Sequence, residues 1–468
     1  MTYEEQKALV RSQVASKIQI QFESKSAILE SITEKLMARE FNRTFYRGGG
    51  QTTNSLVQQI VNLDYKTRIR AAAKGIGISA YAIKQVALAE KDSENIESLG
   101  WVYAIPPQYL TEVDTVKDLE RFFETTLNEL NLEPPTKYIV QSGFLKNQVR
   151  TERLEIVSHL GSRILSEGNQ AKLQTIRQIL TRLLFWLGVS IRHPVFLLIG
   201  PEYIVDLLAI DKRKGRKNDL FVTSQTQILA PALVFKCSVG SRKIMYWYSN
   251  NSTQIFKEST QTFDYSYLSQ PQISSHFVWT KSWGETLKEQ NRKSQVTSIG
   301  PIIFRDLSEY RNRAEQKVEK LRTVTIFDIT PKKSAGTDAF YSDSVMMKFI
   351  RDIRVAINSK YPSALLRLKP KREYSREDSL SYQDFLATQS PELEFLAWDS
   401  NIVDEILKSD LVICIPYSSP ALISRYLRVP TVFYSPSLDF NLDKTHEGIS
   451  VIQGLNELRL FLMTFGTN

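Results

Sequence analysis

The sequence LVICIPYSSPALISRYLRVPTVFY, residues Leu411–Tyr434, decides the fold class of this chain. Its first five residues, Leu411–Ile415, are all apolar, as expected of a parallel strand that is buried on both faces. A turn at Pro416–Pro420 follows, and the helix-sized run Ala421–Leu427 leads to a second apolar run at Pro430–Tyr434. This order of strand, turn, helix and strand is the repeating unit of a parallel α/β sheet.

The same alternation extends upstream through the last third of the chain. Strand-sized apolar runs occur at Thr323–Asp328, Ala364–Leu368 and Leu393–Leu396. Between the first two of them, residues 344–359 form a proline-free stretch that predicts a helix. We therefore expect residues 322–468 to form one doubly wound, Rossmann-like domain.

Two further regions are expected before this domain. Strand-sized runs, spaced widely enough to leave room for helices, occur at Val195–Ile199, Leu220–Thr223, Lys243–Tyr248 and His276–Trp279. They predict a first Rossmann-like domain over residues 186–315. Residues 1–185 contain long proline-free stretches rich in helix formers, such as Glu4–Leu36, and predict a mainly helical N-terminal region. The fold class is therefore α/β.

Composition places the chain among ordinary globular proteins. It is 42% hydrophobic and 24% charged, which excludes global disorder. Two cysteines offer no disulfide framework, and four histidines in no ligand spacing argue against structural zinc. The 60 Lys and Arg exceed the 51 Asp and Glu by nine, a bias that suits phosphorylated ligands, anionic membranes or nucleic acid alike. The first ten residues lack a signal peptide, so a cytoplasmic location is expected.

The turn Pro416–Pro420 is the sharpest candidate for a binding site. Ser419 is suited to cap the following helix, and Pro420 is suited to begin it. Chain direction places the turn at the carboxyl end of a central parallel strand, where open α/β sheets bind ligands. A helix N-terminus attracts phosphate, and the hydroxyls of Ser418 and Ser419 add donors. Capping alone, worth about 1 kcal/mol, would account for one serine rather than two.

The segment around this turn, Val403–Pro436, resembles the second domain of GT-B glycosyltransferases. More narrowly, it resembles the bacterial polysaccharide-biosynthesis family named for a Pro-Phe-Thr-Ser motif, which here reads Pro416-Tyr417-Ser418-Ser419. MYWYSNNS at Met245–Ser252 and the turn Gly300–Phe304 resemble the same family. The resemblance implies two facing Rossmann-like domains that bind a nucleotide sugar. It also implies transfer of the sugar to a glycan or to a lipid-linked glycan acceptor.

Further residues complete the expected donor site. Lys369, Lys371 and Arg372 follow the predicted strand Ala364–Leu368 and emerge at the same sheet edge as the two serines. Cations there would neutralise the charge that builds on a leaving phosphate, although a solvated basic loop explains the same run equally well. Asp328, at the end of the domain's first strand, would orient the donor. Tyr417 lies within the motif.

An inverting transferase also needs a base that deprotonates the acceptor hydroxyl. The resemblance implies that the base comes from the first domain. His193, Glu202, Asp206 and Asp219 lie near predicted strand ends there, and Glu202, Asp206 and His193 are taken as the candidates. Glu202 is the first choice because it follows the Gly200-Pro201 turn. A lone histidine such as His193 is more often a satisfied hydrogen-bonding residue. The predicted loops contain no Asp-x-Asp motif, so neither a metal nor another cofactor is expected.

Two other functions stay open at this point. A sugar-nucleotide epimerase shares the same architecture, and fold alone does not separate it from a transferase. A nucleic-acid-binding protein would use the positive charge, but the basic residues are dispersed and form no known nucleic-acid motif, so nucleic acid is not an expected partner. Peripheral contact with the inner face of a membrane also stays open, with Lys212–Lys217 as a basic run that would touch anionic headgroups.

Overall fold

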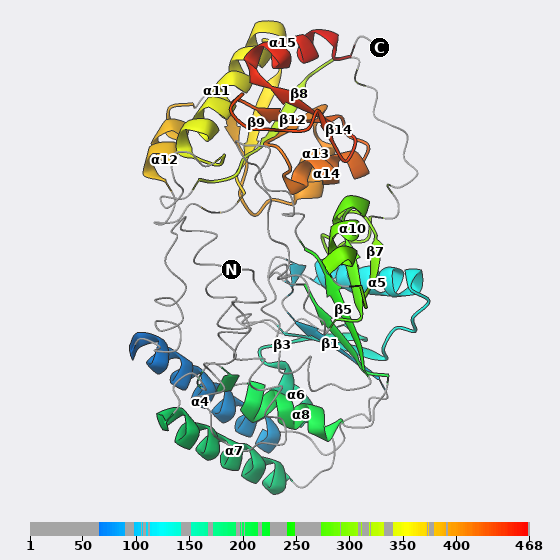
Figure 1. Cartoon of the computed structure of the whole chain (residues 1–468), viewed down its shortest axis with the longest axis vertical. Coiled ribbons are helices and arrows are strands. Elements are labelled where there is room, and N and C mark those ends of the chain that lie inside the picture. Colours follow the sequence, from blue (N-terminus) through cyan, green and yellow to red (C-terminus); the bar gives the residue numbers. More distant parts are fainter. Residues whose placement is uncertain are drawn as a thin grey trace. The chain divides into compact units, whose positions relative to one another are not determined.

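The computed structural model describes residues 65–88, 98–103, 105, 109–110, 113–141, 151–166, 172–192, 197, 199–200, 202–213, 218–224, 241–248, 273–290, 292–307, 310, 318, 320–331, 340–371, 373, 379–389 and 392–466. These residues divide into two compact units, unit 1 up to Asp306 and unit 2 from Leu307 (Figure 1). Each unit is built around its own seven-stranded sheet.

The sheet of unit 1 is parallel throughout. Its strands are β1 (Leu99–Tyr103), β2 (Lys137–Gln141), β3 (Leu154–Val157), β4 (Leu220–Thr223), β5 (Arg242–Tyr246), β6 (Ser275–Val278) and β7 (Gln295–Ser298). They lie in the order β3-β2-β1-β4-β5-β6-β7. The chain thus winds outward from β1 to β3 and then returns to the other side of β1, which is the winding of a Rossmann fold.

Helices cover both faces of this sheet. In α5 (Val113–Glu129), Phe122 packs on Tyr246 with ring centroids 5.3 Å apart. In α10 (Lys281–Gln290), Gly284 lies close to Val278 and Val296. Val278 points to the opposite face from Phe277, which stacks on Tyr246. The two helices therefore lie on opposite faces, as double winding requires.

A helical layer forms the outer part of unit 1 (Figure 1). It consists of α4 (Tyr65–Leu88), α6 (Leu160–Leu165), α7 (Lys172–Arg192), the π-helical turn η3 (Glu202–Asp206) and α8 (Leu207–Lys212). Trp186 of α7 is fully buried against two glycines. A Cβ atom on Gly75 or on Gly200 would come within 2.4 Å of its indole. The absence of a side chain at both positions lets α4 and the turn before η3 approach α7.

The sheet of unit 2 repeats the winding of unit 1. Its strands are β8 (Thr323–Phe327), β9 (Leu365–Lys369), β10 (Glu394–Phe395), β11 (Leu411–Cys414), β12 (Thr431–Ser435), β13 (Thr445–His446) and β14 (Ile449–Gln453). They lie in the order β10-β9-β8-β11-β12-β14-β13, and all neighbours are parallel except β13 and β14. Between the two central strands, Phe327 of β8 is in register with Cys414 of β11.

Two groups of helices cover the faces of this sheet. The helices are α11 (Asp343–Lys360), α12 (Leu380–Ala387), α13 (Ile402–Leu407), α14 (Ser419–Tyr426) and α15 (Gly454–Thr464). Helix α11 packs with α12 and α15, and α13 packs with α14 (Figure 1). On α11, apolar side chains such as Phe349 and Ile353 are completely buried in a core that includes Ile326 and Ile413 of the two central strands.

Two doubly wound domains in an α/β fold are thus confirmed, but the expected boundaries of unit 1 need correction. The prediction of a mainly helical region over residues 1–185 is wrong for residues 99–157, which contain β1, β2 and β3. Four- and five-residue strands give too short a hydrophobic pattern to stand out among longer helical stretches. The predicted helix Glu4–Leu36 lies outside the described residues.

A predicted strand in unit 1 is also wrong. Of the run Val195–Ile199, the structure describes Leu197 and Ile199, and both lie in 3-10 turns instead of a strand. Ile199 is completely buried, which explains why the run is apolar. A short apolar run fits a buried turn or helix as well as it fits a buried strand.

Candidate functional site

The carboxyl edge of the unit 2 sheet contains one point at which the winding reverses. From β8 the chain moves outward to β9 and β10, and it then returns to β11 on the other side of β8. Open α/β sheets bind their ligands outside the carboxyl ends of the two strands at such a point. Asp328 directly follows β8, and the predicted motif Pro416–Ser419 follows β11 after a single residue, Ile415. The structure therefore brings these two predicted elements together.

Tyr417 gives the motif turn an unusual backbone. Its φ is +62°, in the left-handed region that a bulky side chain rarely adopts and that costs roughly 1–2 kcal/mol. Its hydroxyl accepts a hydrogen bond from the Asp443 backbone N–H at 3.2 Å, and its ring lies 4.4 Å from that of His446. Such strain persists only where the surroundings enforce it, and it clusters at functional sites.

The two serines of the motif have different roles from those expected. The helix cap is Ser418, and Ser419 is the first residue of α14. The Ser418 hydroxyl makes no capping hydrogen bond to the helix. It donates instead to the Ile415 carbonyl at 2.8 Å, which tightens the turn. The half-buried Ser419 hydroxyl has no hydrogen-bond partner among the described residues, so it is available to a ligand.

Asp328 is a buried residue that ties the neighbouring loops to β8. Its Oδ1 accepts a hydrogen bond from the Lys371 backbone N–H at 3.1 Å, and its Oδ2 accepts one from the Tyr382 hydroxyl at 2.8 Å. These contacts fix the turn after β9 and the start of α12 next to the motif. Tyr382 was not predicted, and its only sequence signal is its position in the first turn of a capped helix.

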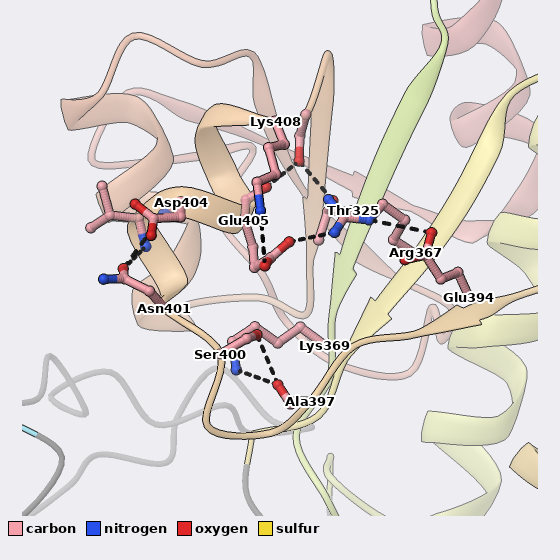
Figure 2. Close-up of polar contacts among 12 residues, drawn as sticks. Thr325, Arg367, Lys369, Glu394, Ala397, Ser400, Asn401, Asp404, Glu405 and Lys408 are labelled. Carbon is pink, nitrogen blue, oxygen red and sulfur yellow. Dashed lines mark hydrogen bonds and ion pairs between the residues drawn. The ribbon is translucent and has the colours of Figure 1, made fainter.

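Lys369 is directed at a loop of its own unit. Its Nζ donates to the Ala397 carbonyl at 3.3 Å (Figure 2). It also donates to the Trp398 carbonyl at 2.6 Å, and both carbonyls lie in the connection between β10 and α13. Burial lowers the pKa of Lys369 below its ordinary value, although nearby carboxylates, Glu405 first, act in the opposite direction. Its role as a phosphate ligand stays a prediction. The Lys371 side chain is exposed, and Arg372 lies outside the described residues.

A buried ion pair beside this loop was missed from the sequence. Arg367 of β9 pairs with Glu405 of α13, and both side chains are largely buried (Figure 2). Glu394 and Lys408 extend the pair at 3.6 Å and 3.5 Å. The contact fixes α13 on the sheet and so holds the loop that Lys369 contacts. A cation inside the apolar run ALLRL is the signal that could have found it.

Among the base candidates of unit 1, Asp206 is the one whose side chain the structure describes. Glu202 begins η3, and neither its side chain nor any part of His193 belongs to the described residues. Neither Glu202 nor Asp206 follows a strand, because the predicted strand before them is not formed. Asp206 is buried at the end of η3, where its Oδ1 lies 3.7 Å from Nε2 of His159.

His159 is an unpredicted partner of Asp206. It caps α6, and its Nδ1 accepts a hydrogen bond from the Ser162 backbone N–H at 3.3 Å. Burial, assisted by the positive charge of Lys74, lowers the pKa of His159 to about 4. The ring is therefore neutral near pH 7. It lies where α6 packs against η3, next to the Asp206 carboxylate.

The unit 1 sheet has its own reversal point, between β1 and β4, with other polar groups on it. Thr223, Met245 and His276 lie in register on one face of β4, β5 and β6. His276 accepts a hydrogen bond from Trp247 Nε1 at its Nδ1, 3.2 Å away, and burial lowers its pKa to about 3. His276 Nε2 and Thr223 Oγ1 are buried without a hydrogen-bond partner. Sequence patterns gave no reason to select either residue.

Within the described part of the chain, no group of three or more His, Cys, Asp or Glu side chains could hold a metal ion. The groups that are expected to bind the donor phosphate are the N-terminus of a helix, serine hydroxyls and lysine side chains.

Residues 218–462 match the family of polysaccharide biosynthesis PFTS motif proteins. The chain belongs to this family. In this PFTS motif protein the family's motif falls on the strained turn between β11 and α14, at the reversal point of the unit 2 sheet. No protein of curated function matches the chain.

Several solved structures are similar to this PFTS motif protein at low identity. Trehalose-6-phosphate synthase OtsA has a TM-score of 0.41 at 12% identity, over 79% of this chain and 91% of its own. The wall teichoic acid polymerase TagF has a TM-score of 0.39 at 10% identity, over 86% and 90%. Sucrose-phosphate synthase from Thermosynechococcus elongatus has a TM-score of 0.40 at 9% identity, over 78% and 90%. Similarity at this level says nothing about activity.

Proposed function

We propose that this PFTS motif protein is a glycosyltransferase that moves a sugar from a nucleotide-sugar donor to a glycan or lipid-linked glycan acceptor in polysaccharide biosynthesis. One observation supports this most directly. The family's motif forms a strained turn that leads into α14 at the reversal point of a doubly wound sheet, the position at which such sheets bind nucleotides.

The first turn of α14 is suited to the donor's phosphate. Its backbone N–H groups, including those of Ser419 and Ala421, have no partner within the helix, and the helix dipole favours negative charge there. The Ser419 hydroxyl adds a donor. As the bond between the sugar and the phosphate breaks, negative charge builds on the leaving phosphate, and these groups would stabilise it. Lys371 and Arg372 would add positive charge, and Asp328 and Tyr417 would shape the site.

The other half of the reaction needs a base in contact with the acceptor. The base would take the proton from an acceptor hydroxyl while the oxygen of that hydroxyl bonds to the anomeric carbon of the donor sugar. Glu202, Asp206 and His193 remain the candidates for an inverting reaction. We propose that no metal ion takes part, because the helix N-terminus and the cations can balance the leaving charge.

The proposal is tested by incubating the purified chain with labelled UDP-, GDP-, CMP- and dTDP-sugars and a membrane or lipopolysaccharide extract, with and without EDTA. We expect the label to enter the extract and EDTA to leave the rate unchanged. Ser419→Ala should weaken nucleotide binding about tenfold, the effect of about one hydrogen bond to a charged group. Ser359→Ala is the matched control, because Ser359 lies near the end of α11 and donates only to the Ala356 carbonyl.

Three outcomes would count against the proposal. Absence of binding to any nucleotide sugar would overturn it. Turnover that requires added divalent metal would remove its metal-free part. Interconversion of free sugar nucleotides without an acceptor, measured in a coupled assay, would assign the chain to the epimerases instead.

A further inference from the structure

The helices α4 and α7 of unit 1 concentrate positive charge without any acidic residue. Helix α4 contains five basic residues and α7 contains four: Lys66, Arg68, Arg70, Lys74, Lys84, Lys172, Arg177, Arg182 and Arg192. The two helices pack against each other and lie side by side (Figure 1). Their nine positive charges equal the excess of the entire chain, 60 minus 51. Arg182 pairs with Asp211 of α8 at 2.8 Å, and Lys172 Nζ donates to the Ala87 carbonyl of α4 at 3.4 Å.

The same two helices expose large apolar side chains. On α7, Leu173, Leu184 and Ile191 are 82%, 70% and 83% exposed. Their spacing of eleven and seven residues places them on one face of the helix. On α4, Ile69, Ile76 and Leu88 are also exposed. These six apolar side chains form the basic–apolar surface together with eight of the nine basic residues, all but Arg192, whose side chain is outside the described residues.

The buried side of α7 is fully used by contacts within unit 1. Ile179 and Trp186 are completely buried, and the indole of Trp186 is enclosed by Gly75 and Gly200. The exposed leucines therefore do not belong to the core of the layer. Within the part of the chain that the structure describes, no helix is long and apolar enough to cross a bilayer. A surface of this composition is suited to lie on a membrane instead of crossing it.

We infer that the basic–apolar surface binds an anionic lipid membrane, with α4 and α7 parallel to the bilayer plane. Charge complementarity selects this occupant. Anionic headgroups attract each nearby lysine or arginine, while exposed leucine and isoleucine side chains enter the boundary of the acyl chains. A second copy of the chain would bring the same positive charge to the contact, and nucleic acid would leave the apolar side chains unused.

The surface differs from the basic run Lys212–Lys217, and the inference does not depend on the identity of the donor. It would place a transferase of lipid-linked glycans next to its acceptor. Since the donor elements lie in unit 2, membrane binding and nucleotide binding can be measured separately.

The experiment is flotation of the full chain with phosphatidylcholine vesicles that do or do not contain phosphatidylglycerol. We expect binding to the anionic vesicles alone, and weaker binding as salt screens the charges. The triple variant Lys66→Gln, Arg70→Gln and Lys84→Gln changes exposed positions. It should reduce the partition coefficient on the order of 100-fold at low salt.

A second variant tests the apolar part. Leu173→Asp, Leu184→Asp and Ile191→Asp together should abolish flotation. Aspartate at three exposed apolar positions of unit 2, Leu438, Leu460 and Met463, is the matched control and should leave flotation unchanged. Nucleotide affinity and the melting temperature are measured for every variant, so that a misfolded protein is recognised.

The inference is overturned if the wild-type chain does not bind anionic vesicles, or if both triple variants float as the wild type does. It is also overturned if the chain binds duplex DNA in preference to vesicles. Sedimentation velocity without lipid tests whether a second copy of the chain binds this surface instead. If the apolar variant converts a dimer into a monomer, a second copy covers the surface.

Discussion

At the amino edge of each sheet, an aspartate side chain links the two central strands. The carboxyl edges of the two sheets differ. In unit 1, Asp219 precedes β4 and accepts a hydrogen bond from the Leu99 N–H at the start of β1, at 3.1 Å. In unit 2, Asp410 precedes β11 and accepts from the N–H groups of Arg322 and Thr323 at the start of β8, at 2.7 and 2.8 Å. In both units an aspartate thus joins the two strands between which the winding reverses.

The carboxyl edges of these strand pairs are built from different groups. Unit 2 presents the strained Tyr417, the half-buried Ser419 and the first turn of α14. Unit 1 presents Thr223 at the end of β4, with the neutral His276 on the same face two strands away. Each sheet is therefore held together at its amino edge, so the carboxyl edge can differ without loss of the fold.

The largest effect is expected at the amino edge of unit 1. Asp219 is buried and also accepts from Arg213 at 2.6 and 2.7 Å and from Trp101 Nε1 at 3.2 Å. Asp219→Ala leaves the buried guanidinium unpaired and should lower the free energy of unfolding by about 3–5 kcal/mol. Asp410→Ala, at a half-buried site with backbone partners, should cost about 1–2 kcal/mol. Urea unfolding of the two variants measures these losses in the free energy of unfolding. Equal losses would show that the Asp219 and Asp410 contacts stabilise their sheets equally.

Acid should destabilise unit 1 through its buried histidines. Their folded pKa values, about 4 for His159 and about 3 for His276, lie below the ordinary value of about 6.5. The unfolded chain therefore binds more protons as the pH falls, and the stability present above pH 6.5 is progressively lost. Each histidine should cost about 2 kcal/mol by pH 5. Melting curves between pH 7 and pH 5 measure the loss.

One variant in each unit tests the source of this pH dependence. In unit 1, His276→Gln should flatten the dependence of the melting temperature on pH, since glutamine retains an acceptor for Trp247 and does not titrate in this range. Burial also lowers the pKa of His446, but the nearby Glu447 and Asp443 oppose the shift, so His446→Gln should change the curve less. A larger change from His446→Gln would place the acid-sensitive contact in unit 2.

The smallest effect separates the two serines of the motif. Ser418→Ala removes the hydrogen bond to the Ile415 carbonyl and should cost about 1 kcal/mol of stability, with a smaller change in nucleotide affinity than Ser419→Ala. Melting temperature and nucleotide titration of both variants give the comparison. The reverse pattern would make Ser418 the ligand contact and Ser419 the structural residue.

The sequence was more informative about unit 2 than about unit 1 for a physical reason. Leu411–Ile415 is apolar at every position because the strand is buried on both faces, and such a run is visible without any alignment. In β1 and β2 the runs LGWVY and KYIVQ mix in glycine and polar residues, so they do not stand out. The motif turn was placed correctly, because strand and helix signals flank it directly.

Side-chain partners were harder to predict because they depend on tertiary contacts. Lys369 was expected to face a phosphate, but it lies within reach of two loop carbonyls. Glu405 lies in the first turn of α13, and only the packing of this helix on the sheet places it against Arg367. Local patterns define a helix start or a strand end, and they contain no information on which distant residue lies opposite.

The register between β8 and β11 has a consequence for the spacing of the motif. Phe327 is level with Cys414, so β8 and β11 end at the same height, and Asp328 and Ile415 are the next residues of the two chain segments. A parallel strand advances about 3.3 Å per residue and alternates its faces. Inserting one residue between Asp410 and Pro416 would therefore move the turn by a full step and reverse the faces of the residues before it. Inserting two residues would restore the original faces, so the fold should tolerate an insertion of two residues in this segment better than an insertion of one.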